Sequence, residues 1–385
     1  MKKLGFGLMR LPIINDEWQN IDMEKARAMI DEYMKEGFCY FDTAYVYHAG
    51  NSEKAFGELV AKRYPRDSYV LTSKMPMFKI KEIDEYEKIF AEQLERCQVE
   101  YFDNYFLHSI GKSVYGKIKE HKAFEFIAQK KAEGKIKHIG FSFHDDAETL
   151  DMILTEHPET ELVLLQINYI DWDDESIQSR KCYETCLKHG VKVAVMEPLK
   201  GGALANLPDE AKSVLLEREP DMSIASWGIR FAASLDNTLV VLSGMSSLEQ
   251  LKDNMSYMKD FKPLTKEEMD AVFKAAEITK STIAIPCTAC KYCVEDCPKQ
   301  IAIPEYFALY NNQHKFGLLA GLHTTFRNIA NGAGKPSECI ACGQCERHCP
   351  QHIDIIESLK LVSQTFEKWV FYGEINAKSK GNFRK

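Results

Sequence analysis

The chain has 385 residues and a mass of 44.1 kDa, which is long enough for one large domain and one small one. Hydrophobic residues make up 45% and charged residues 28%, a balance that excludes a largely disordered chain. The net charge of -8 argues against general nucleic-acid binding, and no run approaches the roughly 18 apolar residues needed to span a bilayer, so we expect neither a nucleic acid nor a membrane as partner.

The first residues, MKKLGFGLMRLP, begin like a signal peptide, but Arg10 and Pro12 interrupt the apolar stretch. We therefore expect no export signal and a cytoplasmic location. Twelve cysteines would suggest disulfides in a secreted protein, yet eight of them fall into two tight groups. Metal binding in a reducing compartment fits that distribution better.

Eight short apolar runs predict strands, and longer amphipathic stretches separate them at intervals of roughly 30 residues. The predicted strands are residues 4–9, 38–42, 68–74, 102–108, 136–142, 161–168, 191–197 and 238–244. Helix-like stretches lie between them, for example residues 23–37, 85–98 and 123–134. Strands and helices in this alternation indicate an α/β fold, a closed (β/α)8 TIM barrel.

An open, doubly wound sheet is the competing fold. It should show a G-x-G-x-x-G turn after the first strand. The GFG at residues 5–7 lacks the third glycine and lies within the strand, so the sequence favours the barrel.

Two cysteine runs of identical spacing, C-x-x-C-x-x-C-x-x-x-C-P, follow the barrel. The first consists of Cys287, Cys290, Cys293 and Cys297, and the second of Cys339, Cys342, Cys345 and Cys349. This spacing is typical of two-cluster ferredoxins, in which the fourth cysteine of each run binds the other cluster. It predicts two 4Fe-4S clusters, with Cys349 completing the first set and Cys297 the second. A pair of four-cysteine zinc sites is the alternative, but such sites use two C-x-x-C pairs separated by a spacer.

A last helix of the barrel is predicted over residues 265–281, and the composition changes abruptly at residues 285–287. We place the barrel at residues 1–281. A bacterial-type two-cluster ferredoxin-like domain with a C-terminal helix and tail follows at residues 282–385. The other four cysteines, Cys39, Cys97, Cys182 and Cys186, lie on predicted strands and helices and are expected to be small buried hydrophobic residues.

Polar side chains stand where successive predicted strands end. Asp42 and Tyr47 follow the second strand in FDTAYVYHAGNSE, Lys74 ends the third, and His108 ends the fourth. The carboxyl ends of barrel strands meet at one mouth, so these four side chains can come together.

Here the sequence resembles the aldo-keto reductases over about residues 1 to 280, and in particular anaerobe-type members with a fused ferredoxin domain. The resemblance implies that Asp42, Tyr47, Lys74 and His108 form the catalytic tetrad. Reduction of a carbonyl leaves an alkoxide that needs a proton, and tyrosine is too weak an acid unless a cation stabilises its anion. Lys74 would be that cation, oriented by Asp42, and His108 would hold the carbonyl oxygen.

The resemblance also implies that the barrel binds NADPH or NADH as its cofactor. The residues expected to contact this cofactor are Ser142, Gln166, Met196, Pro198, Leu199, Ser243, Gly244, Ser246, Gln250 and Asn254. Phe143 replaces the family's usual asparagine, and Met196 replaces its aromatic platform under the nicotinamide ring. Gly244 and Gln250 stand where the family often has Lys and Arg, so we do not expect strong selectivity for the 2′-phosphate of NADPH.

Loop residues after the strands are expected to border the substrate pocket. They are Tyr45, His48, Phe143, His144 and Trp172. This set suggests a partly aromatic small molecule that carries a carbonyl group, but it names no compound.

The leading hypothesis is a carbonyl reductase whose clusters pass electrons or stabilise the small domain. Clusters transfer single electrons and nicotinamide transfers a hydride, so a flavin such as FMN could connect them. A purified protein that contains no flavin and binds none would refute that idea. The alternative is an electron-transfer protein with a redox protein partner, in which the barrel is only a docking platform.

Overall fold

The computed structural model describes residues 1–367 except 16, 176, 282 and 317–319. Its contacts divide the chain into two compact units. The first comprises Met1–Lys200 and Lys212–Lys274, and the second comprises Gly201–Ala211 and the chain from Ala275 onward. One loop of the barrel sequence, Gly201–Ala211, is thus grouped with the second unit, and the domain boundary between residues 281 and 282 stays a prediction.

The first unit is built on a closed barrel of eight parallel strands, in which each strand pairs with the next along the chain and β8 pairs with β1. The strands are β1 (Leu4–Gly7), β2 (Tyr40–Asp42), β3 (Val70–Met75), β4 (Phe102–Ile110), β5 (Ile136–Phe143), β6 (Leu162–Gln166), β7 (Lys192–Met196) and β8 (Thr238–Ser243). All eight overlap the predicted strands, so the predicted (β/α)8 barrel is confirmed.

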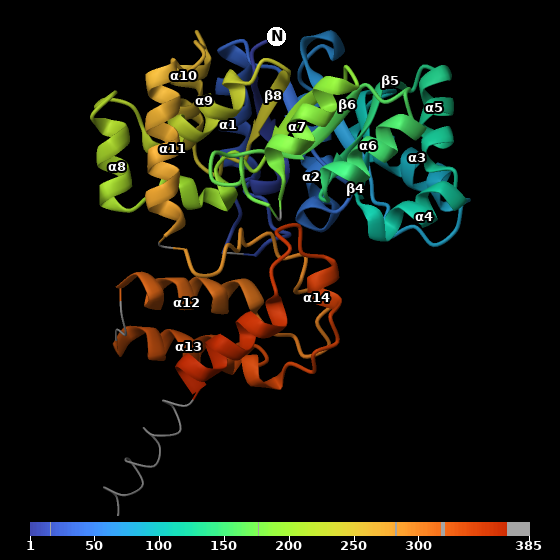
Figure 1. Cartoon of the computed structure of the whole chain (residues 1–385). Coiled ribbons are helices and arrows are strands. Elements are labelled where there is room, and N and C mark those ends of the chain that lie inside the picture. Colours follow the sequence, from blue (N-terminus) through green and yellow to red (C-terminus); the bar gives the residue numbers. More distant parts are fainter. Residues whose placement is uncertain (16, 176, 282, 317–319, 368–385) are drawn as a thin grey trace, which may run out of the picture. The chain divides into compact units, whose positions relative to one another are not determined.

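Helices follow the strands and lie outside them (Figure 1). They are α1 (Met23–Lys35), α2 (Asn51–Phe56), α3 (Glu85–Cys97), α4 (Lys112–Glu120), α5 (Ala123–Ala132), α6 (Ala147–Glu156), α7 (Ser179–Lys188), α8 (Asp209–Leu216), α9 (Ile224–Ser234), α10 (Leu248–Met258) and α11 (Lys266–Lys280). Short polar side chains start several of them. Asp22, Asp146 and Ser247 accept hydrogen bonds from backbone N–H groups at the starts of α1, α6 and α10, which otherwise lack partners.

Strand alternation decides which side chains enter the barrel. An inner cluster consists of Tyr40, Phe106, Leu162, Leu164, Ala194, Val240 and Leu242. On β3, Thr72 reaches the inward Tyr40 hydroxyl at 2.7 Å, whereas Ser73 reaches Glu53 on α2 at 2.7 Å. Lys74, two residues after Thr72, therefore points into the barrel.

The second unit contains α12 (Ile303–Phe316), α13 (Ala320–Gly332), the short helices η6 (Pro336–Glu338) and α14 (Gln344–Arg347), and helical residues 355–367. Its core joins these elements, and the rings of Phe326 and Phe366 stack at 5.6 Å. Asn311 on α12 accepts from the Ile285 N–H at 2.8 Å and donates to the Ile285 carbonyl at 2.7 Å, which ties the helix to the entrance of the first cysteine run. In the part of the chain that the structure describes, no helix is long and apolar enough to cross a membrane.

Gly140 on β5 provides a test of barrel closure. A Cβ atom added there would lie 2.0 Å from the backbone oxygen of Leu162 on β6. Gly140→Ala must push the paired strands apart, so we expect a loss of about 3 kcal/mol in the free energy of unfolding, measured by anaerobic urea denaturation. Gly116→Ala on α4 is the matched control, since its Cβ meets nothing within 4 Å. That change should be neutral or add about 0.5–1 kcal/mol. Equal losses in both variants would contradict the strand-spacing argument.

Candidate functional site

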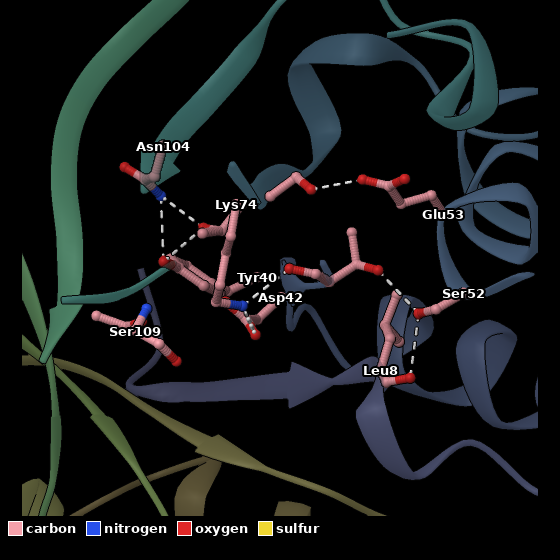
Figure 2. A network of polar contacts seen from close by, with 12 residues as sticks. Leu8, Tyr40, Asp42, Ser52, Glu53, Lys74, Asn104 and Ser109 are labelled. Atoms are coloured by element: carbon pink, nitrogen blue, oxygen red, sulfur yellow. Dashed lines mark hydrogen bonds and ion pairs between the residues drawn. The ribbon is translucent and has the colours of Figure 1, made fainter. Parts of the chain in front are cut away.

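Four buried polar residues meet at the carboxyl ends of β2, β3 and β4. Asp42 ends β2, Lys74 lies near the end of β3, His108 lies on β4, and Tyr47 opens the short helix η2 (Tyr47–Gly50). The Lys74 ammonium donates to Asp42 Oδ1 at 2.6 Å and to the Thr43 carbonyl at 2.8 Å (Figure 2). Lys74 is fully buried and Asp42 nearly so, so this is an ion pair shielded from water.

The aromatic members lie against this pair. The Lys74 Nζ atom is 5.0 Å from the centre of the Tyr47 ring, and the Tyr47 and His108 rings meet edge-on at 6.1 Å. The structure thus brings together all four residues that the sequence singled out. The backbone at Tyr47 turns sharply, because the next two residues, His48 and Ala49, have φ values of 51° and 56°.

Burial sets the protonation of the four groups. It raises the pKa of Asp42 and lowers that of Lys74, and their mutual attraction opposes both shifts. Burial, together with the negative charges of Asp42 and Glu197, raises the pKa of Tyr47 well above its usual value. Burial and the Lys74 charge lower the pKa of His108 well below its usual value. Near neutral pH Tyr47 is therefore a protonated acid, and His108 is a neutral imidazole.

A layer of polar groups lies inside the barrel on the N-terminal side of Lys74. The Asn104 amide donates to the Tyr40 hydroxyl at 3.1 Å and to Thr72 Oγ1 at 3.0 Å (Figure 2). Outside the barrel wall, Thr43 Oγ1 lies 2.8 Å from Ser52 Oγ, and Ser52 donates to the Leu8 carbonyl at 3.1 Å. These bonds hold the loop after β2, on which Tyr47 stands.

The predicted nicotinamide contacts lie at the ends of β5, β6 and β7. Ser142 accepts from the Ser109 N–H at 2.7 Å, and Gln166 donates to Asp171 at 2.8 Å. Asp171 also accepts from Asn168 at 2.7 Å and from the buried Lys200 at 2.7 Å. Gln166 is thus part of a buried network that the sequence did not reveal.

The end of β7 carries a residue that sequence reasoning missed. Met196 packs against the inner cluster, and Glu197 follows it with φ 56°, a conformation that non-glycine residues rarely adopt. The Glu197 carbonyl accepts from Asn168 at 3.1 Å and from the Lys200 N–H at 3.0 Å. The next residues, Pro198 and Leu199, press against Gly228 on α9, whose missing side chain leaves room for them.

The segment after β8 faces the segment after β1. Ser246 donates to the Arg10 carbonyl at 2.8 Å, and its N–H donates to Gln250 at 2.8 Å. Ser243 accepts from Asn254 at 3.2 Å. The aliphatic part of the Arg10 side chain lies 3.0–3.1 Å from the point where a Cβ of Gly244 would stand, so only glycine lets it lie so close. Sequence reasoning did not predict that Arg10, which is far away in the chain, lies beside Gly244.

The residues expected to border the substrate pocket have different surroundings in the structure. His144 lies near enough to His108 to lower its pKa, whereas Phe143 packs edge-on against Phe141. Tyr45 donates to Glu92 on α3 at 2.9 Å, and Trp172 packs on Tyr183 and Phe231. Of these residues, His144 lies near the tetrad, and a role in the pocket stays a prediction for all five.

Two aromatic residues near the mouth were not predicted. Trp18 stacks on the buried His48 ring at 4.3 Å, and its carbonyl lies 2.6 Å from His48 Nδ1. Phe78 meets the His108 ring edge-on at 5.5 Å and is 47% exposed.

In the second unit, each crossed set of cysteines surrounds one cavity. Cys287, Cys290, Cys293 and Cys349 line one cavity. Cys339, Cys342, Cys345 and Cys297 line the other. These are the two sets that the spacing predicts. Four cysteine sulfurs around an apolar cavity are the donors that a cubane cluster requires.

The two cysteine loops repeat each other at an interval of 52 residues, a regularity that sequence reasoning did not use. Left-handed φ values recur in the pairs Ala289 and Ala341 (54° and 53°), Lys291 and Gly343 (68° and 72°), and Gln300 and His352 (51° and 50°). The backbone therefore takes the same course around both cavities.

The loop after β7 belongs to the same unit as the cysteine runs. Gly201 has φ 66°, and a Cβ there would lie 2.3 Å from the carbonyl oxygen of Thr288, which stands between Cys287 and Cys290. Glycine is required at this position both for its conformation and for the close approach.

Comparison with known proteins agrees with this architecture. Residues 3–277 match the aldo/keto reductase family, and residues 286–353 match the 4Fe-4S dicluster domain. YqkF of Bacillus subtilis, an uncharacterized oxidoreductase, is 22% identical over 309 residues, which cover 71% of this chain and 92% of that protein. All twelve cysteines are free of disulfides, which agrees with thiolates available for clusters.

Solved structures resemble the barrel. The aldo-keto reductase AKR11C1 from Bacillus halodurans (holo form) is 25% identical, with a TM-score of 0.57, over 71% of this chain and 91% of that one. An aldo/keto reductase from Klebsiella pneumoniae, solved with NADP and acetate, shares the fold at 19% identity and a TM-score of 0.57, over 71% and 90% of the two chains. Because the family match spans residues 3–277, the chain belongs to the aldo/keto reductase family, and its C-terminal part contains a 4Fe-4S dicluster domain.

Proposed function

We propose that the barrel reduces the carbonyl group of a small molecule with NADPH or NADH, and that the C-terminal domain holds two 4Fe-4S clusters. The observation that carries the proposal is the convergence of the buried Lys74–Asp42 ion pair with Tyr47 and His108 at one end of the barrel. A buried ammonium beside a protonated tyrosine is costly to maintain, and groups perturbed in this way cluster at functional sites.

Each residue of the tetrad has a distinct part in this proposal. A bound nicotinamide would supply a hydride to the carbonyl carbon. Tyr47 donates its proton to the carbonyl oxygen, and the Lys74 charge stabilises the tyrosinate that remains. Asp42 holds the ammonium at 2.6 Å, and neutral His108 orients the oxygen through a hydrogen bond.

The segment beside Gly244 fits the phosphates of the cofactor. The family's usual Lys and Arg are missing there, but the aliphatic part of the Arg10 side chain packs along Gly244, and the Arg10 carbonyl accepts from Ser246. The start of the next helix, α10, favours anions. The same segment would suit a flavin phosphate, and a flavin is the adapter we propose between hydride and single-electron chemistry.

The tetrad is tested with Tyr47→Phe. Loss of the acid should lower kcat for reduction of a test aldehyde by about 100- to 10,000-fold and leave the iron content intact. Tyr64→Phe is the control, because Tyr64 also makes a hydroxyl bond, to Asp31, but on the outside of the barrel. Full activity in Tyr47→Phe would instead favour a barrel that serves as a docking platform for electron transfer.

Arg10 is tested through cofactor preference. Arg10→Ala should raise KM for NADPH by roughly fivefold while KM for NADH changes less, because a partly exposed cation contributes about 1 kcal/mol to pairing with a phosphate. The measurement compares steady-state kinetics with both cofactors. Arg27→Ala, on the exposed face of α1, is the control. An equal effect on both cofactors would mean that Arg10 does not contact the 2′-phosphate.

The crossed ligation of the clusters is tested with double variants. If Cys349 completes the first set, Cys290→Ser with Cys349→Ser removes one cluster, and about four irons per chain remain. Cys290→Ser with Cys297→Ser then damages both clusters, and little iron remains. Iron and acid-labile sulfide in anaerobically purified protein distinguish these outcomes. Uncrossed ligation would reverse the two results, and Cys186→Ser should keep about eight irons.

A further inference from the structure

Behind Lys74, outside the barrel wall, lies a second buried carboxylate. Glu53 on α2 is completely buried. Its Oε1 atom accepts from Ser73 Oγ at 2.7 Å and from Gln93 Nε2 at 2.6 Å; Glu53 is labelled in Figure 2. A buried carboxylate is stable only when such donors satisfy it.

Gln93 also binds the backbone of β3 at Lys74. Gln93 Nε2 also lies 3.1 Å from the Lys74 carbonyl and 3.0 Å from Ser73 Oγ. The Gln93 side chain is itself fixed, because its Oε1 accepts from the Tyr105 hydroxyl on β4. Glu53 and Gln93 thus hold the outer side of β3 at the residue whose inner side presents the ammonium.

Closely packed helices enclose Glu53. A Cβ on Gly57, just after α2, would lie 2.6 Å from the Arg96 carbonyl on α3, so the two helices touch at their backbones. The Arg96 guanidinium lies 3.5 Å from Glu53 Oε2 and bonds Glu92 as well. The carboxylate is therefore fixed between α2, α3 and β3.

Two carboxylates flank Lys74, with Asp42 on the inside of the barrel and Glu53 on the outside. Burial lowers the pKa of Lys74, and the charges of both carboxylates raise it. We propose that Glu53 is a positioning residue for Lys74. Glu53 holds strand β3, which carries Lys74, and it supplies part of the negative charge that keeps the Lys74 ammonium protonated. The inference rests on the proposed function, because it concerns the same tetrad.

The Glu53 side chain changes its charge near neutral pH. Burial raises its pKa to about 7, and the bonds from Ser73 and Gln93 and the charge of Arg96 oppose that rise. The carboxylate therefore forms as the pH rises through neutrality. The titratable and charged groups that face Glu53 are Lys74 on β3, Glu92, Arg96 and Cys97 on α3, and Tyr105 on β4.

Glu53→Gln tests the proposal, since it keeps the shape and removes the charge. In the full-length protein, NMR of 13C-labelled lysine side chains, with Lys74 assigned through Lys74→Arg, should show the Lys74 titration midpoint lowered by about one pH unit. Glu268→Gln is the matched control, because Glu268 also pairs with an arginine, Arg230, but lies on α11. An unchanged Lys74 midpoint in Glu53→Gln, or equal shifts in both variants, would overturn the proposal.

Kinetics provide the second measurement. The alkaline limb of the pH–rate profile for a test aldehyde should move to lower pH in Glu53→Gln, by the same amount as the NMR midpoint. If wild-type protein reduces no carbonyl, the proposed function fails, yet the NMR result still decides on Glu53. Should Glu53→Gln not fold, Ser73→Ala removes a bond that stabilises the carboxylate, and it should shift Lys74 in the same direction by a smaller amount.

Stability provides a check on the titration itself. The pKa of Glu53 is raised from 4.5 to about 7 on folding, so the folded state holds this proton more tightly than the unfolded state does. The wild type should therefore lose stability relative to Glu53→Gln as the pH rises from about 5 to about 7, and no further above that range. A difference in Tm that stays constant across this range would show that Glu53 does not titrate there, and the charge part of the proposal would fall.

Discussion

The ion pair of Lys74 and Asp42 is the interaction on which the mouth of the barrel depends. Both side chains are almost completely shielded from water, and an isolated ammonium in such surroundings would cost several kcal/mol. The carboxylate at 2.6 Å and the Thr43 carbonyl at 2.8 Å compensate for that cost. Because the loss of one partner leaves a buried, uncompensated charge, the two residues have to be present together.

The pair also requires the strands to be in register. Asp42 on β2 lies opposite Thr72 on β3, two residues before Lys74, so the lysine side chain reaches back to the carboxylate of the neighbouring strand. A shift by one residue would turn Lys74 out of the barrel and place Ser73 inside. Hydrogen bonds on both sides of β3 oppose such a shift. Within the barrel β3 bonds with Tyr40 and Asn104, and outside it β3 bonds with Glu53 and Gln93. The chemistry of the site and the register of the sheet thus depend on the same residues.

Sequence patterns were sufficient for the features that depend on local order. Apolar runs predicted all eight strands. Strand ends predicted which four polar residues meet, because the carboxyl ends of barrel strands converge on one mouth. The cysteine spacing likewise predicted which four thiolates share a cavity, since three ligands in one loop need a fourth from elsewhere.

What the sequence did not reveal depends on contacts between distant segments. Arg10 and Gly244 are separated by almost the whole barrel, and they meet only because β1 and β8 close it. Tyr45 was expected at the pocket from its place in a loop, but its hydroxyl bonds Glu92 on α3. Loop position predicts where a backbone runs, whereas the direction of a side chain depends on partners that other elements supply.

The division into two units also depends on contacts between distant segments of the chain. Lys200 is held in the first unit by Asp171, at 2.7 Å, and the next residue, Gly201, packs on Thr288 in the second. The dicluster part is consequently not a simple C-terminal addition, because its packing includes a loop that the barrel sequence supplies. Any substitution at Gly201 would disturb the backbone between Cys287 and Cys290, although it lies more than eighty residues before them in the sequence.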